Sequence, residues 1–194
     1  MLAVVVAAAF AQLSAEVKEA LLLKHNALRA QEPASDMVKM VWDADTAALA
    51  QAWADKCTIG HSSRGERNGA GENLYMHSWA LSRPGNDLTD GVQNWYDEKP
   101  AYPFGNGKFS SACNVGNYQT TRGEKHISMC GHYTQVVWAA SERLGCGAAD
   151  CSGSGSWGTY LVCQYAPAGN MLGGQIYRTG DQCSACGAKP ECCS

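Results

Sequence analysis

The sequence has no excess of positive charge and no basic run, which removes one large class of partners. Its 194 residues include 15 Lys and Arg against 18 Asp and Glu, which gives a formal net charge of −3. Neutralisation of phosphates by Lys and Arg supplies most of the affinity of proteins for nucleic acids. We therefore exclude nucleic acid as an expected partner.

Long apolar runs are missing from most of the chain. Beyond its first residues, no stretch approaches the ~20 apolar residues that a helix needs to span a bilayer, so we expect no transmembrane anchor. Residues 1–11 are apolar and end in Ala9-Phe10-Ala11, which places small residues at the two positions that a signal peptidase reads. We interpret 1–11 as a secretory signal peptide and expect a secreted, extracellular protein. Cleavage at Ala15 and a buried N-terminal helix are the alternatives.

Two signatures of catalysis are also absent from the sequence. There is no Gly-x-Ser-x-Gly segment between a strand and a helix, the arrangement that exposes a nucleophilic serine in many hydrolases. There is no glycine-rich phosphate loop either. The sequence therefore does not favour a serine hydrolase, although Ser62, Ser63 and Ser78 could be imagined as its nucleophile.

Cysteine, in contrast, is abundant. Ten cysteines in a chain the size of one domain exceed what a protein of a reducing compartment carries. The count predicts five disulfides in an oxidising compartment. The spacing alone does not select one pairing among the many that ten cysteines allow.

Hydrophobic periodicity predicts helices alternating with strands around one sheet. Ser14 and either Asp43 or Asp45 are expected N-caps, and Glu98 is expected on the last turn of the third helix. Four helices are predicted: one from residue 14 to about 31, one that starts at 43 or 45, one over 87–98 and one over 131–138. The predicted strands are 37–42 and 160–165. Between residues 100 and 129 we expect a long glycine-rich loop.

Five short segments carry a family resemblance. They are Gly60-His61-Ser62, Gly71-Glu72-Asn73-Leu74, Trp95-Tyr96-Asp97-Glu98, residues 131–138 (GHYTQVVW) and residues 162–170 (VCQYAPAGN). Together they resemble the signature segments of the CAP superfamily, which includes cysteine-rich secretory proteins, antigen-5 venom allergens and plant pathogenesis-related proteins. The resemblance implies an α+β fold, a three-layer α-β-α sandwich with a central antiparallel sheet. We expect the CAP domain over 16–178 and a cysteine-rich, hinge-like tail over 179–194.

The resemblance also implies a site. In the family two histidines and two acidic residues line one cleft, and the matching residues here are His61, Glu72, Glu98 and His132. Imidazoles and carboxylates can bind a divalent ion directly or through water, and zinc suits such nitrogen and oxygen donors. We therefore predict a metal site for zinc at these four residues. The alternative is a hydrogen-bonded polar cluster in which the carboxylates fix the imidazole tautomers and no ion binds.

The cysteine pairing follows from the resemblance as well. Relatives with matching cysteines imply three bridges in the domain, Cys57–Cys151, Cys113–Cys130 and Cys146–Cys163. The hinge-like tail implies a crossed pairing of Cys183 with Cys192 and Cys186 with Cys193. A four-cysteine metal clip is the alternative for the tail.

Three hypotheses of function are open at this point. The first is a non-enzymatic binding protein for a sterol or other lipid, with Tyr102, Phe104 and Phe109 as walls of an apolar groove, or for an extracellular protein. These aromatics could instead simply cover the edge of the sheet. The second is an extracellular metal-assisted hydrolase in which zinc on His61 and His132 activates water. The third is a defence or venom-type signalling ligand. We expect no hydrolase activity.

Overall fold

The structure is a computed structural model. It describes residues 13–102, 106–114, 118–121, 124–127, 129–154, 157–182 and 184–185. The helices are α1 (Ala15–Arg29), α2 (Ala44–Ala54), α3 (Thr89–Tyr96) and α4 (Gly131–Val136), with three 3-10 turns at Lys99–Ala101, Ser111–Asn114 and Ser152–Ser154. The strands are β1 (Val41–Trp42), β2 (Gly71–His77), β3 (Tyr118–Thr121), β4 (Glu124–Ile127), β5 (Arg143–Asp150) and β6 (Thr159–Ala166).

The first two helices begin where their caps predict. The hydroxyl oxygen of Ser14 accepts a hydrogen bond from the backbone N–H of Val17 at 3.3 Å. The carboxylate of Asp43 accepts one from the backbone N–H of Thr46 at 2.7 Å, which selects Asp43 over Asp45 as the cap of α2. Each cap satisfies a backbone N–H that the first helical turn leaves without a partner.

The main sheet has the strand order β1-β5-β6-β2. Strands β5, β6 and β2 are antiparallel, but β1 pairs with β5 in parallel. The three long strands thus form the expected antiparallel sheet, and the short strand β1 adds a parallel edge that makes the whole sheet mixed. Strand β1 is shorter than the strand predicted over 37–42, since only Val41 and Trp42 pair with β5.

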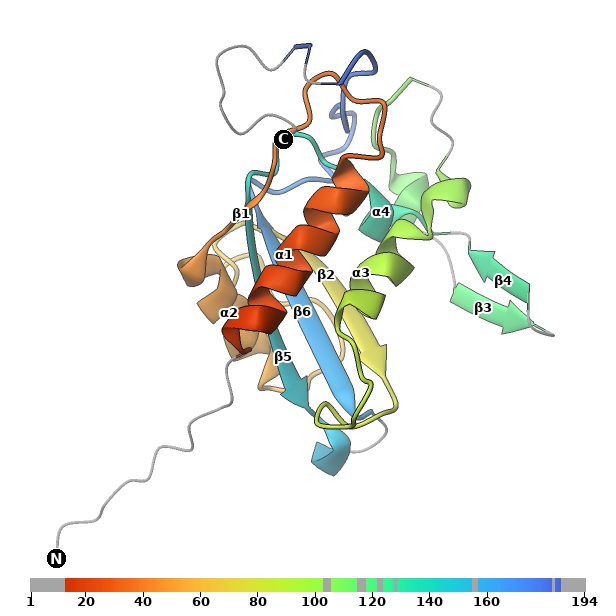
Figure 1. The fold of residues 1–194 in the computed structure, drawn as a ribbon. Helices are drawn as coiled ribbons and strands as arrows, with labels where there is room; N and C mark the ends of the chain where they lie inside the picture. The colour runs from red at the N-terminus through yellow and green to blue at the C-terminus, as the bar shows by residue number, and fades with distance from the viewer. Residues whose placement is uncertain are drawn as a thin grey trace, which may run out of the picture.

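Helices cover the main sheet on both sides and form a three-layer α-β-α sandwich (Figure 1). Helix α2 lies on one face, and α1 and α3 lie side by side on the other. Glycines on β5 allow α2 to approach closely: a Cβ atom at Gly145 would lie 2.1 Å from the backbone nitrogen of Ala47. Any larger residue at Gly145 would push α2 away from the sheet.

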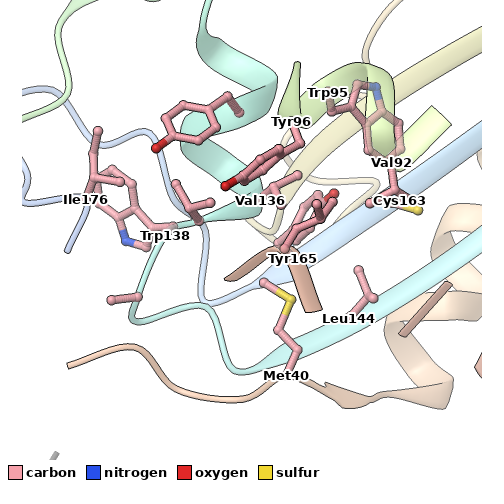
Figure 2. Close-up of a cluster of buried hydrophobic side chains, with 14 of the residues drawn as sticks. Met40, Val92, Trp95, Tyr96, Val136, Trp138, Leu144, Cys163, Tyr165 and Ile176 are labelled. Atoms are coloured by element: carbon pink, nitrogen blue, oxygen red, sulfur yellow. The ribbon is translucent and has the colours of Figure 1, made fainter. Parts of the chain in front are cut away.

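The hydrophobic core is largest under α1, α3 and α4. Figure 2 shows part of this cluster, in which side chains from both sheet and helices meet. Its labelled members are Met40, Val92, Trp95, Tyr96, Val136, Trp138, Leu144, Cys163, Tyr165 and Ile176. A smaller cluster packs on the α2 face around Ala50, Tyr160 and Val162. The two clusters pack the sheet between its helical layers.

The third helix is shorter than predicted. It ends at Tyr96, and its C-cap is Asp97. Glu98 therefore lies just beyond the helix, where it caps the 3-10 turn Lys99–Ala101. Pro100 at the start of that turn has no N–H to continue an α-helical ladder, which explains the early end.

Three disulfides connect the described residues. They join Cys57 with Cys151, Cys113 with Cys130 and Cys146 with Cys163, the pairing that the family resemblance implies. The bridge at Cys113 lies at the base of the segment that carries the β3–β4 hairpin, which stands away from the sandwich (Figure 1). The predicted tail pairing of Cys183 with Cys192 and Cys186 with Cys193 lies outside the described residues. No helix of the described part of the chain is long and apolar enough to cross a bilayer.

Candidate functional site

The first pair of predicted site residues is His61 with Glu72. His61 lies in the loop that follows α2, and Glu72 lies on β2, a strand that sequence periodicity did not identify. The Nδ1 of His61 is 2.8 Å from Oε1 of Glu72. Since an ionised carboxylate only accepts hydrogen bonds, the imidazole carries its proton on Nδ1.

Glu72 is saturated with hydrogen-bond donors. Its side chain is fully buried. Besides His61, it accepts from the backbone N–H of Ser62 at 2.9 Å, from the Ser62 hydroxyl at 2.6 Å and from the Gln164 amide at 3.0 Å. Burial, the largest single influence, raises the pKa of Glu72, but the hydrogen bonds from His61, Ser62 and Gln164 together outweigh it and hold that pKa below its ordinary value. The carboxylate is therefore a charged anchor for its neighbours.

The second pair is His132 with Glu98. Nδ1 of His132, the second residue of α4, is 2.6 Å from Oε1 of Glu98. The other oxygen of Glu98 accepts the backbone N–H groups of His132 and Tyr133 at 2.9 and 3.2 Å. Both donors belong to the first turn of α4, where backbone N–H groups have no helical partner. Glu98 thus caps the helix and orients the imidazole at the same time.

Strand β2 ties the two pairs together. Glu72 holds His61, and the next residue, Asn73, donates its amide to the backbone carbonyl of His132 at 3.1 Å. Two consecutive residues of one strand therefore contact both histidine segments. The structure thus builds two His–Glu pairs from the four predicted residues, each with a ring hydrogen-bonded through Nδ1.

The donor chemistry of these pairs fits a metal held by the histidines with the glutamates behind them. With Nδ1 bonded to carboxylate, Nε2 is the ring nitrogen of His61 and of His132 that can bind a metal. Glu72 already accepts four hydrogen bonds, so it suits orientation of His61 better than direct ligation. Within the described residues, no three His, Cys, Asp or Glu side chains are grouped closely enough to hold an ion by themselves. A metal would therefore complete its coordination with water or with a bound ligand.

The predicted ligand-binding aromatics lie elsewhere. Tyr102 and Phe109 are buried in the main core, where Tyr102 packs on Tyr133 and Phe109 on Trp138. Phe104 lies outside the described residues. The two described rings therefore contact core side chains and are not presented at an open groove.

A groove that sequence reasoning missed opens between α1 and the segment that precedes α3. Its volume is about 600 Å³. The apolar side chains of Val17, Leu81 and Leu88 line it. Helical spacing on α1 predicts a core-facing stripe, but only the tertiary structure shows that part of this stripe faces a cavity.

Sequence reasoning also missed the roles of Ser62 and Gln164. Both lie inside the quoted signature segments, so the signal was present, but neither position was assigned a function. Their contacts with Glu72 depend on a loop conformation and on the β2–β6 register, respectively.

A three-layer sandwich with two His–Glu pairs beside one sheet strand defines a CAP domain. The model of the Cysteine-rich secretory protein family (CAP) matches residues 22–165, and the chain belongs to this family. It is 38% identical over 178 residues to cysteine-rich secretory protein 2 of Cavia porcellus, covering 88% of this chain and 65% of that protein. It is 39% identical over 180 residues to peptidase inhibitor 16 of Mus musculus, covering 90% of this chain and 32% of that protein.

Solved structures agree with this assignment. Na-ASP-1 superposes with a TM-score of 0.77 at 30% identity, covering 93% of this chain and 46% of that one. The structure of NaASP2 with Zn²⁺ superposes with a TM-score of 0.71 at 29% identity, covering 88% of this chain and 90% of that one. The chain spans about two thirds of the cysteine-rich secretory protein and about one third of the peptidase inhibitor.

Proposed function

We propose that this chain is a secreted, non-enzymatic binding protein whose cleft binds a divalent metal through Nε2 of His61 and Nε2 of His132. The observation that carries the proposal is the pairing of each imidazole with a buried or nearly buried glutamate through Nδ1. Such a carboxylate fixes the tautomer and raises the basicity of the ligating nitrogen. Zinc is the preferred ion because its borderline softness suits imidazole, and it would act as a charge centre for a bound ligand. The similarity to NaASP2, a protein whose structure is known with Zn²⁺, supports this choice.

The contacts of Ser62 favour binding over hydrolysis. Its hydroxyl donates to Glu72 at 2.6 Å, and its side chain is directed at this carboxylate and not at an imidazole. A serine nucleophile needs a base within hydrogen-bond reach that can take its proton and pass it on, usually a histidine. Ser62 instead helps to hold Glu72 in place.

Calorimetric titration with zinc tests the proposal. Wild-type protein should bind zinc, and the double variant His61→Ala, His132→Ala should lose that binding. His77→Ala is the matched control, because His77 is a partly exposed histidine at the far end of β2 that contacts Trp79 and neither pair. Equal zinc affinity in the wild type and the double variant would contradict the proposal.

The groove between α1 and the segment before α3 supports lipid as a second ligand. Its volume of about 600 Å³ lies within the range of small-molecule sites, which are mostly apolar. We propose that it binds the apolar body of a sterol or other lipid.

Binding of a fluorescent sterol and of a fluorescent fatty acid tests the groove. Leu81→Arg places a charge on the groove wall and should weaken binding at least about tenfold, because burying an unpaired charge is costly. Leu23→Arg is the matched control: it makes the same substitution on α1 at a side chain that is 56% exposed. If both variants bind like the wild type, the groove is not the lipid site.

A further inference from the structure

One buried amide contacts the His61–Glu72 pair in an unusual way. Gln164 lies on the central strand β6 and is fully buried. Its Nε2 donates to Oε2 of Glu72 at 3.0 Å. Its Oε1 is the one buried side-chain polar atom, among the described residues, that has no hydrogen-bond partner. Leaving such an acceptor unpaired costs free energy, so the arrangement needs a physical reason.

The charge of Glu72 supplies that reason. Both carboxylate oxygens only accept: Oε1 takes the His61 ring and the Ser62 backbone, and Oε2 takes the Ser62 hydroxyl and Gln164. Turning the Gln164 amide over would place its oxygen against Oε2 of the carboxylate, so that two acceptors face each other. In the observed orientation the Gln164 amide group donates to the buried charge of Glu72, and the neutral Gln164 carbonyl stays unpaired. A hydrogen bond to the buried charge stabilises the protein more than one to the neutral carbonyl would.

The register of the sheet makes this contact obligatory. Glu72 on β2 and Gln164 on β6 are direct cross-strand partners in an antiparallel ladder. Directly opposed side chains in such a ladder project to the same face of the sheet. Gln164 is therefore held beside Glu72 by the backbone, not by a flexible loop.

His61, in contrast, has little packing of its own. Its side chain is 55% exposed, while that of Glu72 is fully buried. The orientation of the ring and the position of its proton therefore depend on the hydrogen bond from Nδ1 to Glu72. Whatever fixes the Glu72 carboxylate therefore also fixes which ring nitrogen of His61 carries the proton.

We propose that Gln164 is a positioning residue that acts through Glu72 and holds His61 in its Nδ1–H tautomer. In this tautomer Nε2 carries the lone pair that is available to a ligand. The inference deepens the proposed metal site and rests on it for the role of Nε2. It is specific to one histidine of the two. Glu98 is held by backbone N–H groups of His132 and Tyr133, so His132 does not depend on Gln164.

Nitrogen-15 NMR of the histidine rings tests the inference directly, because it distinguishes the two neutral tautomers. The measurement is made without metal at about pH 8, above the ordinary pKa of histidine. In the wild type, His61 should be in the Nδ1–H form. Gln164→Met keeps the length of the side chain but removes the donor, and should give a mixture of Nδ1–H and Nε2–H forms at His61 and no change at His132.

A matched control separates this effect from general damage to the fold. Gln51→Met makes the same substitution on α2, where the amide contacts Asp55 and Ala148 and does not reach Glu72. It should leave the tautomer of His61 unchanged. An Nε2–H form of His61 in the wild type would overturn the proposal even if Gln164→Met failed to fold. An unchanged tautomer in a folded Gln164→Met protein would overturn it too.

Zinc titration of the same proteins adds a second readout. Loss of a residue that orients a metal ligand costs about 10-fold to 100-fold in affinity, so Gln164→Met should weaken zinc binding by that factor and Gln51→Met should not. If the wild type binds no zinc, the proposed metal function fails, while the tautomer measurement still decides the role of Gln164. If zinc binds with equal affinity to wild type and Gln164→Met, the positioning role is wrong and the metal site stands.

Discussion

The ring of His25 and the hydroxyl of Tyr165 meet in the middle of the protein, 3.0 Å apart. His25 lies on α1 and Tyr165 on β6, so this hydrogen bond joins the helical layer to the sheet across 140 residues of sequence. The other ring nitrogen of His25 contacts the backbone carbonyl of Leu21 at 2.8 Å. Both polar ends of a fully buried imidazole are thus satisfied without a charge.

This burial makes stability depend on pH. Burial, the largest influence, lowers the pKa of His25 from 6.5 to about 4. Because the pKa of His25 is lower in the folded protein, the unfolded chain takes up a proton at a higher pH than the folded protein does. The contribution of His25 to stability is therefore complete above pH 6.5 and is lost as pH falls toward 4. The titration of His25 alone should lower the free energy of unfolding by about 2 kcal/mol between pH 7.5 and pH 5.

Urea unfolding at these two pH values measures the drop. His25→Gln keeps a polar side chain that does not titrate, so its free energy of unfolding should change less between the two pH values. A wild-type protein as stable at pH 5 as at pH 7.5 would show that His25 is not buried in its neutral form.

Arg29 should be essential for folding. Its guanidinium is buried and donates to five backbone carbonyls. These carbonyls belong to Val38, Val136, Trp138, Ala139 and Ser141. Arg29→Met would leave them without this donor, which should cost at least about 4 kcal/mol or prevent folding.

The conservative variant Arg29→Lys makes the same test sharper. An ammonium group keeps the charge but has three donors on one atom and cannot reproduce the fork of a guanidinium. Its free energy of unfolding in urea should therefore also fall by several kcal/mol. Equal stability of Arg29→Lys and the wild type would mean that the charge, and not the geometry, matters.

Two of the three described disulfides, Cys57–Cys151 and Cys113–Cys130, close loops of very different length and should therefore contribute differently to stability. Cys57–Cys151 spans a sequence separation of 94, and Cys113–Cys130 spans 17. On the loop-entropy model the longer loop contributes about 4.7 kcal/mol and the shorter about 3.2 kcal/mol. Replacing Cys57 and Cys151 by Ala should therefore lower the free energy of unfolding by about 1.5 kcal/mol more than the same change at Cys113 and Cys130. An equal or reversed loss in urea unfolding would show that loop entropy does not control the difference.

We expect no hydrolysis of peptides or esters by this chain, with or without zinc. Turnover requires an activated nucleophile and a group that stabilises the developing oxyanion, and the contacts of Ser62 and Glu72 provide an anchor instead. A library of peptide and ester substrates should give the same rates for wild type, Glu72→Gln and His132→Ala. Activity in the wild type that is lost in both variants would establish an enzyme.

Local features of the fold were predictable because they depend on neighbours along the chain. The caps Ser14 and Asp43 act on N–H groups three residues away, so their spacing is visible in the sequence. The end of α3 was missed because Asp97 and Glu98 are compatible with a helix, and only the 3-10 turn around Pro100 ends it. The strands β2 and β5 were missed because both are glycine-containing and lie against helices, which hides the alternation of an exposed strand.

The sequence by itself determined the family, through its signature segments, and with it the prediction that His61, Glu72, Glu98 and His132 form a site. Only the tertiary structure decided how they pair. The β2–β6 register places Glu72 opposite Gln164, and the turn after α3 places Glu98 under the first turn of α4. The physical reason is that hydrogen bonds and charges act over a few ångströms of space, while the partners they join here lie between 10 and 92 residues apart in the chain.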